Sequence, residues 1–297
     1  MSGALPIVFD PASLIMLNVI MALMMFGVSL TLRLEDFKRI ILAPIAPIAG
    51  LFAQFFLLPL ATCLFTWALN VDPDLALGMI LVASCPGGSF SNIMTWLARG
   101  NVAVSVSMTA VSSLVATVLT PLNFAFYGWL NPHTRQYLTQ ITLEPSSILL
   151  LVLLVLAVPL VIGMLTGRKF PKLVARSEKP LRIVSLLVFL TFVAIAFSNN
   201  FDLFIDRFNS FFWLVVAHNL LALSLGYGMG KALKLPVADR RAVTMEVGIQ
   251  NSGLGLVILF TFFPQAGGMM LITAFWGVWH LVSGLTLSQI WARRPYD

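Results

Sequence analysis

Nine apolar runs, each close to the length of a bilayer-crossing helix, occupy most of this chain of 297 residues. A transmembrane helix needs about 20 consecutive apolar residues, and a helix satisfies its own backbone hydrogen bonds where there is no water. The sequence therefore predicts an all-α polytopic membrane protein with nine transmembrane helices. The predicted spans are 13–32, 43–69, 75–97, 102–130, 146–166, 181–198, 210–233, 240–263 and 268–291.

Composition agrees with a protein that has most of its mass in the bilayer. Hydrophobic residues make up 59% of the chain and charged residues 10%, whereas a soluble domain carries roughly 25% charged residues. No soluble domain or long linker interrupts the spans, so residues 1–297 form one transmembrane domain. Cys63 and Cys85 lie in apolar segments and are expected to be packed thiols. The first basic residue is Arg33, so the first run lacks the positive flank of a cleavable signal peptide and is expected to be retained.

The distribution of basic residues predicts the orientation. With nine spans, all but two of the 18 Lys and Arg residues fall on one side of the membrane, the exceptions being Arg135 and Arg207. Cytoplasmic loops carry an excess of Lys and Arg. We therefore expect a multi-pass protein of the cell (inner) membrane with its N-terminus outside and its C-terminus in the cytoplasm. The net charge of +6 follows this topology and does not indicate nucleic-acid binding.

Two of the spans contain residues that interrupt a helix. In span 75–97, Pro86 removes a backbone donor, and Gly87 and Gly88 loosen the backbone that follows. In span 240–263, polar residues and glycines crowd the stretch 246–255. Irregular backbone at membrane depth is tolerated where protein or a water-filled cavity surrounds it.

The two interrupted spans are the third and the eighth, which indicates an inverted repeat. Spans five apart run in opposite directions, and each interrupted span lies between two spans without such an interruption. Paired discontinuous helices point to the substrate and ion site of a transporter. One such cluster by itself would be read as helix-packing residues, but two clusters in matching positions, one with a carboxylate, favour a site.

Glu246 is the most unusual residue of these clusters. It is the one acid of the 12 that we place inside a span. A buried intramembrane charge is unfavourable by several kcal/mol unless it is paired. No Lys or Arg lies inside a neighbouring predicted span, so the compensating charge is expected to be a cation or a proton from outside the chain.

Oxygen-bearing side chains accompany Glu246 in the pattern that a hard cation such as Na⁺ requires. Ser105 and Thr109 are four residues apart, so both hydroxyls lie on one helix face. An unwound stretch at 247–250 would free backbone carbonyls, and the start of each second half-helix would attract an anion. Further neutral oxygens come from Gln54, Ser91, Asn92 and Gln250.

Three segments give the chain a resemblance to the bile acid:sodium symporter family over nearly its whole length. They are the runs Met25–Leu32, Cys85–Asn101 and Glu246–Gly253. The resemblance implies a panel domain packed against a core domain in which two discontinuous helices cross. On this mapping the panel comprises spans 13–32, 146–166 and 181–198, and the core comprises the other six.

The resemblance also implies two Na⁺ sites behind the crossing and an organic anion between panel and core. The first ion site would use Ser91, Asn92, Ser105, Thr109 and Glu246. The second would use Gln54, Glu246 and Gln250 with the backbone carbonyls of Val247 and Ile249. The anion would lie near Ser89, Asn251 and His280. The chain departs from this family in two respects, because bacterial relatives commonly have ten spans and the position of Ser89 is often Thr.

We therefore predict a secondary active transporter, not an enzyme, that couples Na⁺ to an amphipathic organic anion by alternating access. The anion is expected to be bile acid-like or a small carboxylate such as pantoate, and the protein is expected to function as a monomer. Proton coupling through Glu246 and a non-transporting membrane receptor are the alternatives. An intramembrane enzyme using Ser252 and His280 is disfavoured because no nucleophile motif surrounds Ser252.

Overall fold

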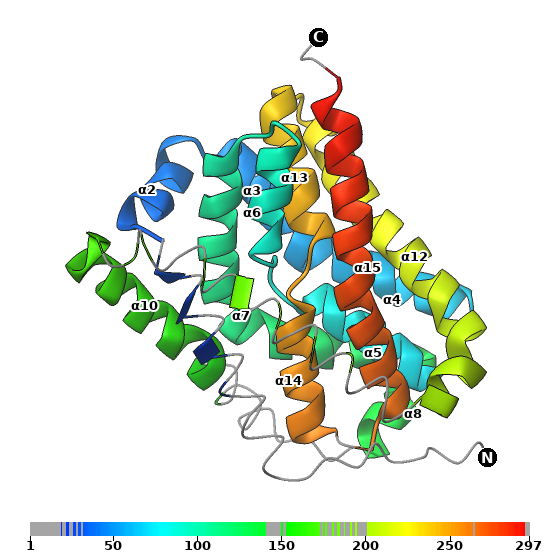
Figure 1. Cartoon of the computed structure of the whole chain (residues 1–297). Coiled ribbons are helices and arrows are strands. Elements are labelled where there is room, and N and C mark those ends of the chain that lie inside the picture. Colours follow the sequence, from blue (N-terminus) through cyan, green and yellow to red (C-terminus); the bar gives the residue numbers. More distant parts are fainter. Residues whose placement is uncertain are drawn as a thin grey trace.

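The computed structural model in Figure 1 describes residues 32–140, 153–172, 201–263 and 265–294, together with isolated residues between 19 and 30, Leu150, and isolated residues between 174 and 194. The described secondary structure is helical, apart from one isolated β-bridge. Its helices, with π-helices labelled η, are α2 (Leu34–Leu42), α3 (Ile45–Phe52), η1 (Ala53–Leu57), α4 (Leu58–Ala68), α5 (Pro73–Ser84), α6 (Phe90–Leu97), α7 (Val102–Leu130), α8 (Pro132–Gln140), η2 (Leu153–Ala157), α10 (Val158–Lys169), α12 (Phe201–Ala232), α13 (Val237–Gly248), α14 (Ser252–Phe262) and α15 (Gly267–Ala292).

Four of the described helical stretches are long and apolar enough to cross a membrane: Ile45–Ala68, Val102–Leu130, Phe211–Ala232 and Gly267–Ala292. They match four of the predicted spans, and the all-helical membrane class is confirmed. Span 13–32 and span 181–198 lie mostly outside the described residues, and span 146–166 lies partly outside them. The count of nine spans, the division into panel and core, and the inverted repeat therefore stay predictions.

Both predicted helix interruptions are present. The third span is divided into α5, which ends at Ser84, and α6, which begins at Phe90. The eighth is divided into α13, which ends at Gly248, and α14, which begins at Ser252. Each pair of half-helices is separated by a short extended segment, which we call the first break (residues 85–89) and the second break (residues 249–251).

The two breaks lie side by side and hydrogen-bond to each other. Gly87 and Gln250 form an antiparallel β-bridge. Gly88 N donates to Ile249 O at 2.7 Å, and Asn251 N donates to Pro86 O at 2.8 Å. Around this junction, α6 and α13 lie toward the end of the molecule that holds the C-terminus, and α5 and α14 lie toward the other end (Figure 1). The two broken helices thus pass through the molecule in opposite directions and meet at their interruptions.

Proline explains two widened turns. The π-helices η1 and η2 each end two residues before a proline, which is the second residue of the next helix: Pro59 in α4 and Pro159 in α10. Because proline has no N–H, the carbonyl one turn earlier loses its partner and the turn can widen. The first of these π-helices carries Gln54, which is fully buried.

Three helical segments extend into stretches that the sequence suggested were loops. α2 follows the first predicted span, α12 begins at Phe201, and α8 follows α7 directly. The start of α8 has a local cause. Asn131 Oδ1 accepts from the backbone N–H of His133 at 3.0 Å, and Pro132 occupies the first helical position, where its missing N–H leaves no bond unmade.

The centre of the packed helices is α5 with α14. Every residue from Leu75 to Ser84 is buried, as is every residue from Ser252 to Phe260. α5 packs against α4, α7 and α15, so both broken helices are enclosed by unbroken ones. Cys63 and Cys85 are buried and free, as predicted. Polar groups at the breaks are therefore shielded from lipid by protein.

Basic residues gather where α6, α13 and α15 end or begin. Arg241 Nη1 donates to Ala98 O at 2.7 Å, and its Nη2 donates to Arg294 O at 3.2 Å. Asn101 Nδ2 donates to Asp239 Oδ1 at 2.7 Å. These bonds hold the end of α6, the start of α13 and the end of α15 together, so the basic residues of three separate segments share one end of the molecule.

Candidate functional site

Glu246 lies in the last turn of α13, directly before the second break, and is fully buried. Three hydroxyls donate to its carboxylate. Thr109 Oγ1 lies 2.8 Å from Oε1, Ser105 Oγ lies 3.1 Å from Oε2, and Ser91 Oγ also donates to Oε2. Ser91 comes from α6, whereas Ser105 and Thr109 come from α7, so three helices converge on one charge.

Asn92 joins the same group through its amide oxygen. Ser105 Oγ lies 2.8 Å and Thr109 Oγ1 lies 3.3 Å from Asn92 Oδ1. The structure thus brings together all five residues predicted for the first ion site. The (i, i+4) spacing of Ser105 and Thr109 does place both hydroxyls on one face of α7, where they meet Glu246.

Acceptor oxygens outnumber protons in this cluster. Ser105 has one hydroxyl proton, yet its Oγ is within hydrogen-bond distance of both Asn92 Oδ1 and Glu246 Oε2. Thr109 is likewise shared between Asn92 Oδ1, Glu246 Oε1 and the carbonyl of Ser105. Lone pairs without protons attract a cation, and hydroxyls can rotate to turn their own lone pairs toward it. The cluster therefore has the electrostatic character of a cation site.

Gly87 lets the carboxylate approach the first break. A Cβ built on Gly87 would lie 2.3 Å from Glu246 Oε1 and 2.8 Å from Glu246 Cδ. Contacts this short are not tolerated, so any other residue at this position would displace the carboxylate. Gly87, which helps to interrupt the first broken helix, thus also leaves space for the carboxylate of Glu246 from the second broken helix.

The second predicted ligand set is only partly connected. Gln54 Nε2 donates to Gln250 Oε1 at 3.4 Å, and Gln250 Nε2 donates to Val247 O at 2.7 Å. Gln54 Oε1 is buried and has no hydrogen-bond partner among the described residues. The carbonyl of Ile249 accepts from Gly88 N and retains a second lone pair. Oxygen atoms that can accept further hydrogen bonds, Gln54 Oε1 and the carbonyl of Ile249, are therefore present here too. No hydrogen bond among the described residues joins Gln54 or Gln250 to Glu246.

Ser89 and Asn251 occupy the N-cap positions of α6 and α14. Both are partly exposed, and the paired breaks place them at the junction. Asn251 Oδ1 accepts from Leu254 N at 3.1 Å. His280 is on α15, is 3% exposed and has no described partner for Nδ1. No hydrogen bond among the described residues joins His280 to Ser89 or Asn251, so the three anion candidates do not form one bonded cluster.

Asn219 has a role that the sequence did not reveal. Its Nδ2 donates to Gly248 O at 2.9 Å, and its Oδ1 accepts from Ser283 Oγ at 2.5 Å. The carbonyl of Gly248 lies between those of Val247 and Ile249, so Asn219 holds the backbone of the second break from α12 and is itself held by α15. A buried amide opposite a predicted helix interruption was the available signal.

His218, the neighbour of Asn219, is a packing residue. It is fully buried, its Nε2 lies 2.7 Å from Thr62 Oγ1, and its ring is tilted by 54° against that of Trp276, with the centroids 4.6 Å apart. No hydrogen bond among the described residues connects it to the breaks.

Taken together, one carboxylate and several neutral oxygens from two broken helices and the unbroken α7 suit a monovalent cation. A divalent site would draw on several acidic or imidazole ligands, and no group of three or more His, Cys, Asp or Glu side chains that could hold a metal occurs among the described residues. The half-helix starts at Ser89 and Asn251 present backbone N–H groups beside this cation site. Such helix starts suit an anion.

Comparison with known proteins gives a family match. Residues 18–207 match the model of the Sodium Bile acid symporter family. An "Uncharacterized sodium-dependent transporter YocS" of Bacillus subtilis is 32% identical over 278 residues, which cover 94% of this chain and 83% of the relative.

Eukaryotic relatives are longer than this chain. The "Probable sodium/metabolite cotransporter BASS1, chloroplastic" of Arabidopsis thaliana is 33% identical over 274 residues, 91% of this chain and 65% of the relative. The "Sodium/bile acid cotransporter 4" of Homo sapiens is 29% identical over 242 residues, 81% of this chain and 54% of the relative. The match thus spans about two thirds and about half of these two proteins.

Proposed function

The chain belongs to the sodium bile acid symporter family, and we propose that it is a symporter in which Na⁺ bound at Glu246 drives uptake of an organic anion. It is a multi-pass membrane transporter and not an enzyme. The observation that carries the proposal is the convergence of Ser91, Ser105 and Thr109 on one buried carboxylate. The surplus of acceptor oxygens around it calls for a cation.

Two Na⁺ ions are proposed, one on each side of Glu246. The first would be held by Ser91, Asn92, Ser105, Thr109 and Glu246. The second would be held by Gln54, Gln250, Glu246 and the carbonyls of Val247 and Ile249. The unpartnered Gln54 Oε1 supports the second site, because a buried oxygen without a donor is destabilising unless something occupies the space beside it.

Coupling follows from the position of the ligands on the two broken helices. Glu246 belongs to α13, whereas Ser91 and Asn92 belong to α6. An ion held by both fixes the two breaks relative to each other. This ordering also fixes Ser89 and Asn251, the N-caps that would hold the anion. Na⁺ binding and anion binding would therefore stabilise the same arrangement, which is what linkage between two sites requires.

The direction of transport follows from charge. If two Na⁺ accompany a monovalent anion, one net positive charge moves inward. This movement yields roughly 2.3 kcal/mol per 100 mV. The proposed orientation, with the N-terminus outside, rests on the excess of basic residues on one predicted side.

The substrate class is an amphipathic organic anion, either bile acid-like or a small carboxylate such as pantoate. Purified protein would be screened with taurocholate, a steroid sulfate and pantoate for thermal stabilisation in Na⁺ and in K⁺. A transported anion should stabilise more in Na⁺, since ligand binding shifts stability by mass action. Equal stabilisation in both salts by every anion would argue against the coupled site.

Proton coupling is the competing mechanism, because a proton on Glu246 would also relieve the surplus of acceptors. Uptake into liposomes would be measured at fixed pH with Na⁺ replaced by choline. Loss of uptake in choline is expected. Continued accumulation in choline that disappears when the pH gradient is collapsed would favour protons.

A further inference from the structure

A groove that plays no part in the proposed ion site lies between α12, α13 and α15. Its volume is about 570 Å³. Leu220, Val282 and Ile290 line it and are 63%, 49% and 45% exposed. α12 and α15 lie on the side of the molecule away from α2 and α10 (Figure 1). The groove therefore opens on an apolar outer face of helices that cross the membrane.

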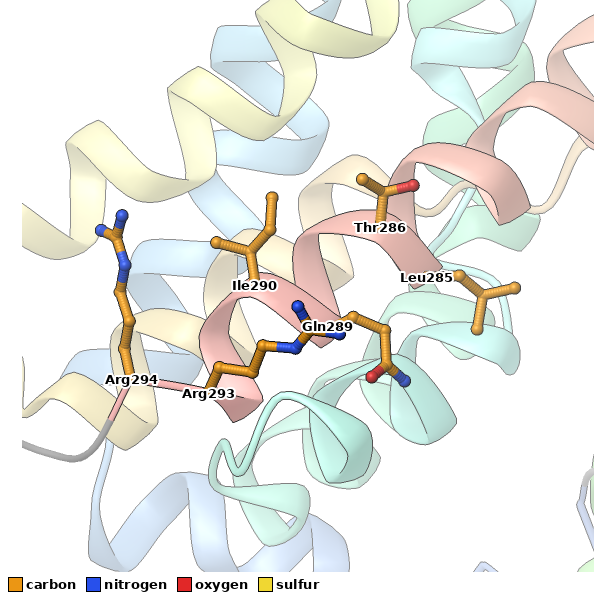
Figure 2. Close-up of a pocket in the computed structure, with 6 residues that line it drawn as sticks. All are labelled: Leu285, Thr286, Gln289, Ile290, Arg293 and Arg294. Carbon is orange, nitrogen blue, oxygen red and sulfur yellow. The ribbon is translucent and has the colours of Figure 1, made fainter.

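A second hollow continues this groove to the end of α15. Its volume is about 610 Å³, and it shares Thr286 and Ile290 with the groove. Arg293 and Arg294 line it as well. Figure 2 shows these two arginines at the end of α15, with their side chains extending to opposite sides. Both are exposed, and neither side chain forms an ion pair with a described residue. The groove thus adjoins a hollow on α15 that contains two guanidinium groups.

Aromatic rings mark the level at which the groove meets the basic end. Tyr227 and Trp291 both line the groove, and their rings stack with centroids 6.4 Å apart. Arg240 lies 5.1 Å over the ring of Tyr227, and Arg241 lies 5.7 Å over that of Trp291. Arg241 also donates to the carbonyl of Arg294. Tyr and Trp concentrate at the boundary between the hydrocarbon and headgroup layers of a membrane, so the arginines are at headgroup level.

We propose that this groove is a binding site for an acidic glycerophospholipid. One acyl chain would lie along Leu220, Val282 and Ile290, and the phosphate would accept hydrogen bonds from Arg293 and Arg294 once these exposed side chains turn toward it. The planar guanidinium group matches a phosphate with two parallel hydrogen bonds. Basic residues at the cytoplasmic ends of transmembrane helices attract anionic headgroups. Asp239, at the start of α13, accepts a hydrogen bond from Asn101.

Charge and shape together select a lipid over a free anion. A soluble phosphate ester would contact the arginines and leave the apolar groove empty. A zwitterionic phospholipid would fill the groove, but its headgroup would bring a positive ammonium close to the two guanidinium groups and would carry no net negative charge. An acidic phospholipid meets both requirements. The inference does not depend on which anion the protein transports.

The test uses the full-length protein in detergent, titrated with phosphatidylglycerol or with phosphatidylcholine of the same acyl chains. Bound lipid would be counted by native mass spectrometry. Phosphatidylglycerol should bind at least about tenfold more tightly, and the Arg293→Gln/Arg294→Gln variant should lose this preference, since each basic residue near a headgroup contributes measurably. The matched control is Arg168→Gln/Lys169→Gln, an exposed basic pair in the last turn of α10, which should retain it.

Two further measurements separate the alternatives. Ser224→Trp fills the groove from α12, and it should reduce binding of both lipids. Glycerol 3-phosphate at equal concentration should not displace phosphatidylglycerol from the unmodified protein. Equal binding of the two lipids, an unchanged preference in the Arg293→Gln/Arg294→Gln variant, or displacement by glycerol 3-phosphate would each overturn the proposal.

Discussion

The first break and the second break lie against each other, yet they arise from different causes. The first contains Pro86, Gly87 and Gly88, which disfavour a helix whatever surrounds them. The second contains Ile249, Gln250 and Asn251, none of which forces a helix to end. Its backbone is extended at Ile249, with φ −114° and ψ 96°. The first break is thus encoded locally, whereas the second depends on its partners.

Those partners can be named. Asn219 donates a hydrogen bond to the carbonyl of Gly248. The backbone of the first break hydrogen-bonds to Ile249 and Asn251, and the side chain of Asn251 caps the N-terminus of α14. The carboxylate of Glu246 lies on α13, just before this second break. The helix after the first break, α6, therefore supplies neutral oxygens, whereas the helix before the second break, α13, supplies the charge.

Proline alone does not explain the first break. α7 continues from Val102 to Leu130 although Pro121 lies inside it. What distinguishes Pro86 is the pair of glycines that follows and the bridge to Gln250. A membrane helix tolerates one missing hydrogen bond, and it ends where the next residues gain other partners.

The largest expected effect comes from removing the charge of Glu246, which lies just before the second break. Glu246→Gln keeps the shape of the side chain and should reduce Na⁺-driven uptake at least about 100-fold, because truncating one partner of a buried charge interaction removes several kcal/mol. Glu35→Gln makes the same chemical change at an exposed site on α2 and should leave uptake unchanged. Initial rates in proteoliposomes would measure both. Near-normal uptake by Glu246→Gln would sink the ion assignment.

Next in size is the steric contact between the two breaks. Gly87→Ala places a methyl group against the carboxylate of Glu246, and overpacking of this kind is destabilising by about 1–3 kcal/mol. Uptake should fall about tenfold or more. Gly228→Ala is the matched control, because a Cβ there meets nothing within 4 Å. If both variants transport equally well, the close approach of the Glu246 carboxylate to Gly87 is not required for transport.

A smaller effect is expected at the residue that holds the second break. Asn219→Ala leaves the buried carbonyl of Gly248 without its donor, which is unfavourable by about 1–3 kcal/mol. The Na⁺ concentration for half-maximal uptake should rise about tenfold, and the maximal rate should change less. Asn219→Asp should also fail, because an ionised carboxylate cannot donate.

Asn131→Ala provides the control for this prediction. Asn131 is a buried amide that donates to Thr66 Oγ1 at 3.0 Å, beside the start of α8. Its loss should lower the melting temperature without changing the Na⁺ dependence. A loss of stability alone in Asn219→Ala would reduce Asn219 to a packing role.

The smallest effect should come from Pro86→Ala. Gly87 and Gly88 still disfavour a helix by about 1 kcal/mol each. A continued helix would also lose the bonds from Gly88 N and Asn251 N, worth about 1 kcal/mol each. Uptake should therefore change less than about threefold. Complete loss of transport would show that the proline, and not the junction, maintains the first break.

The sequence predicted features that depend on local chemistry. The break at Pro86 follows from backbone sterics, and the shared face of Ser105 and Thr109 follows from helical spacing. The grouping of these hydroxyls with Glu246 was implied by the resemblance to the symporter family. The four long apolar spans could be predicted from the composition and length of their sequences alone.

Other features depend on contacts between distant segments and could not be predicted. Nothing near Asn219 in the chain indicates that it holds Gly248, because the pairing results from α12 packing on α13. The space that Gly87 leaves for Glu246 exists only when the breaks meet. The π-helix that carries Gln54 was not predicted, because a proline such as Pro59 permits a widened turn before it without requiring one.

Direct measurement of ion binding tests the central claim that Glu246 joins the two breaks around Na⁺. Purified protein without transported anion would be titrated with ²²Na⁺, and bound ion would be counted by scintillation proximity. The unmodified chain should bind saturably, with two ions per chain, and Glu246→Gln should show no saturable binding over the same range. Equal saturable binding by Glu246→Gln and by the unmodified chain would contradict the account.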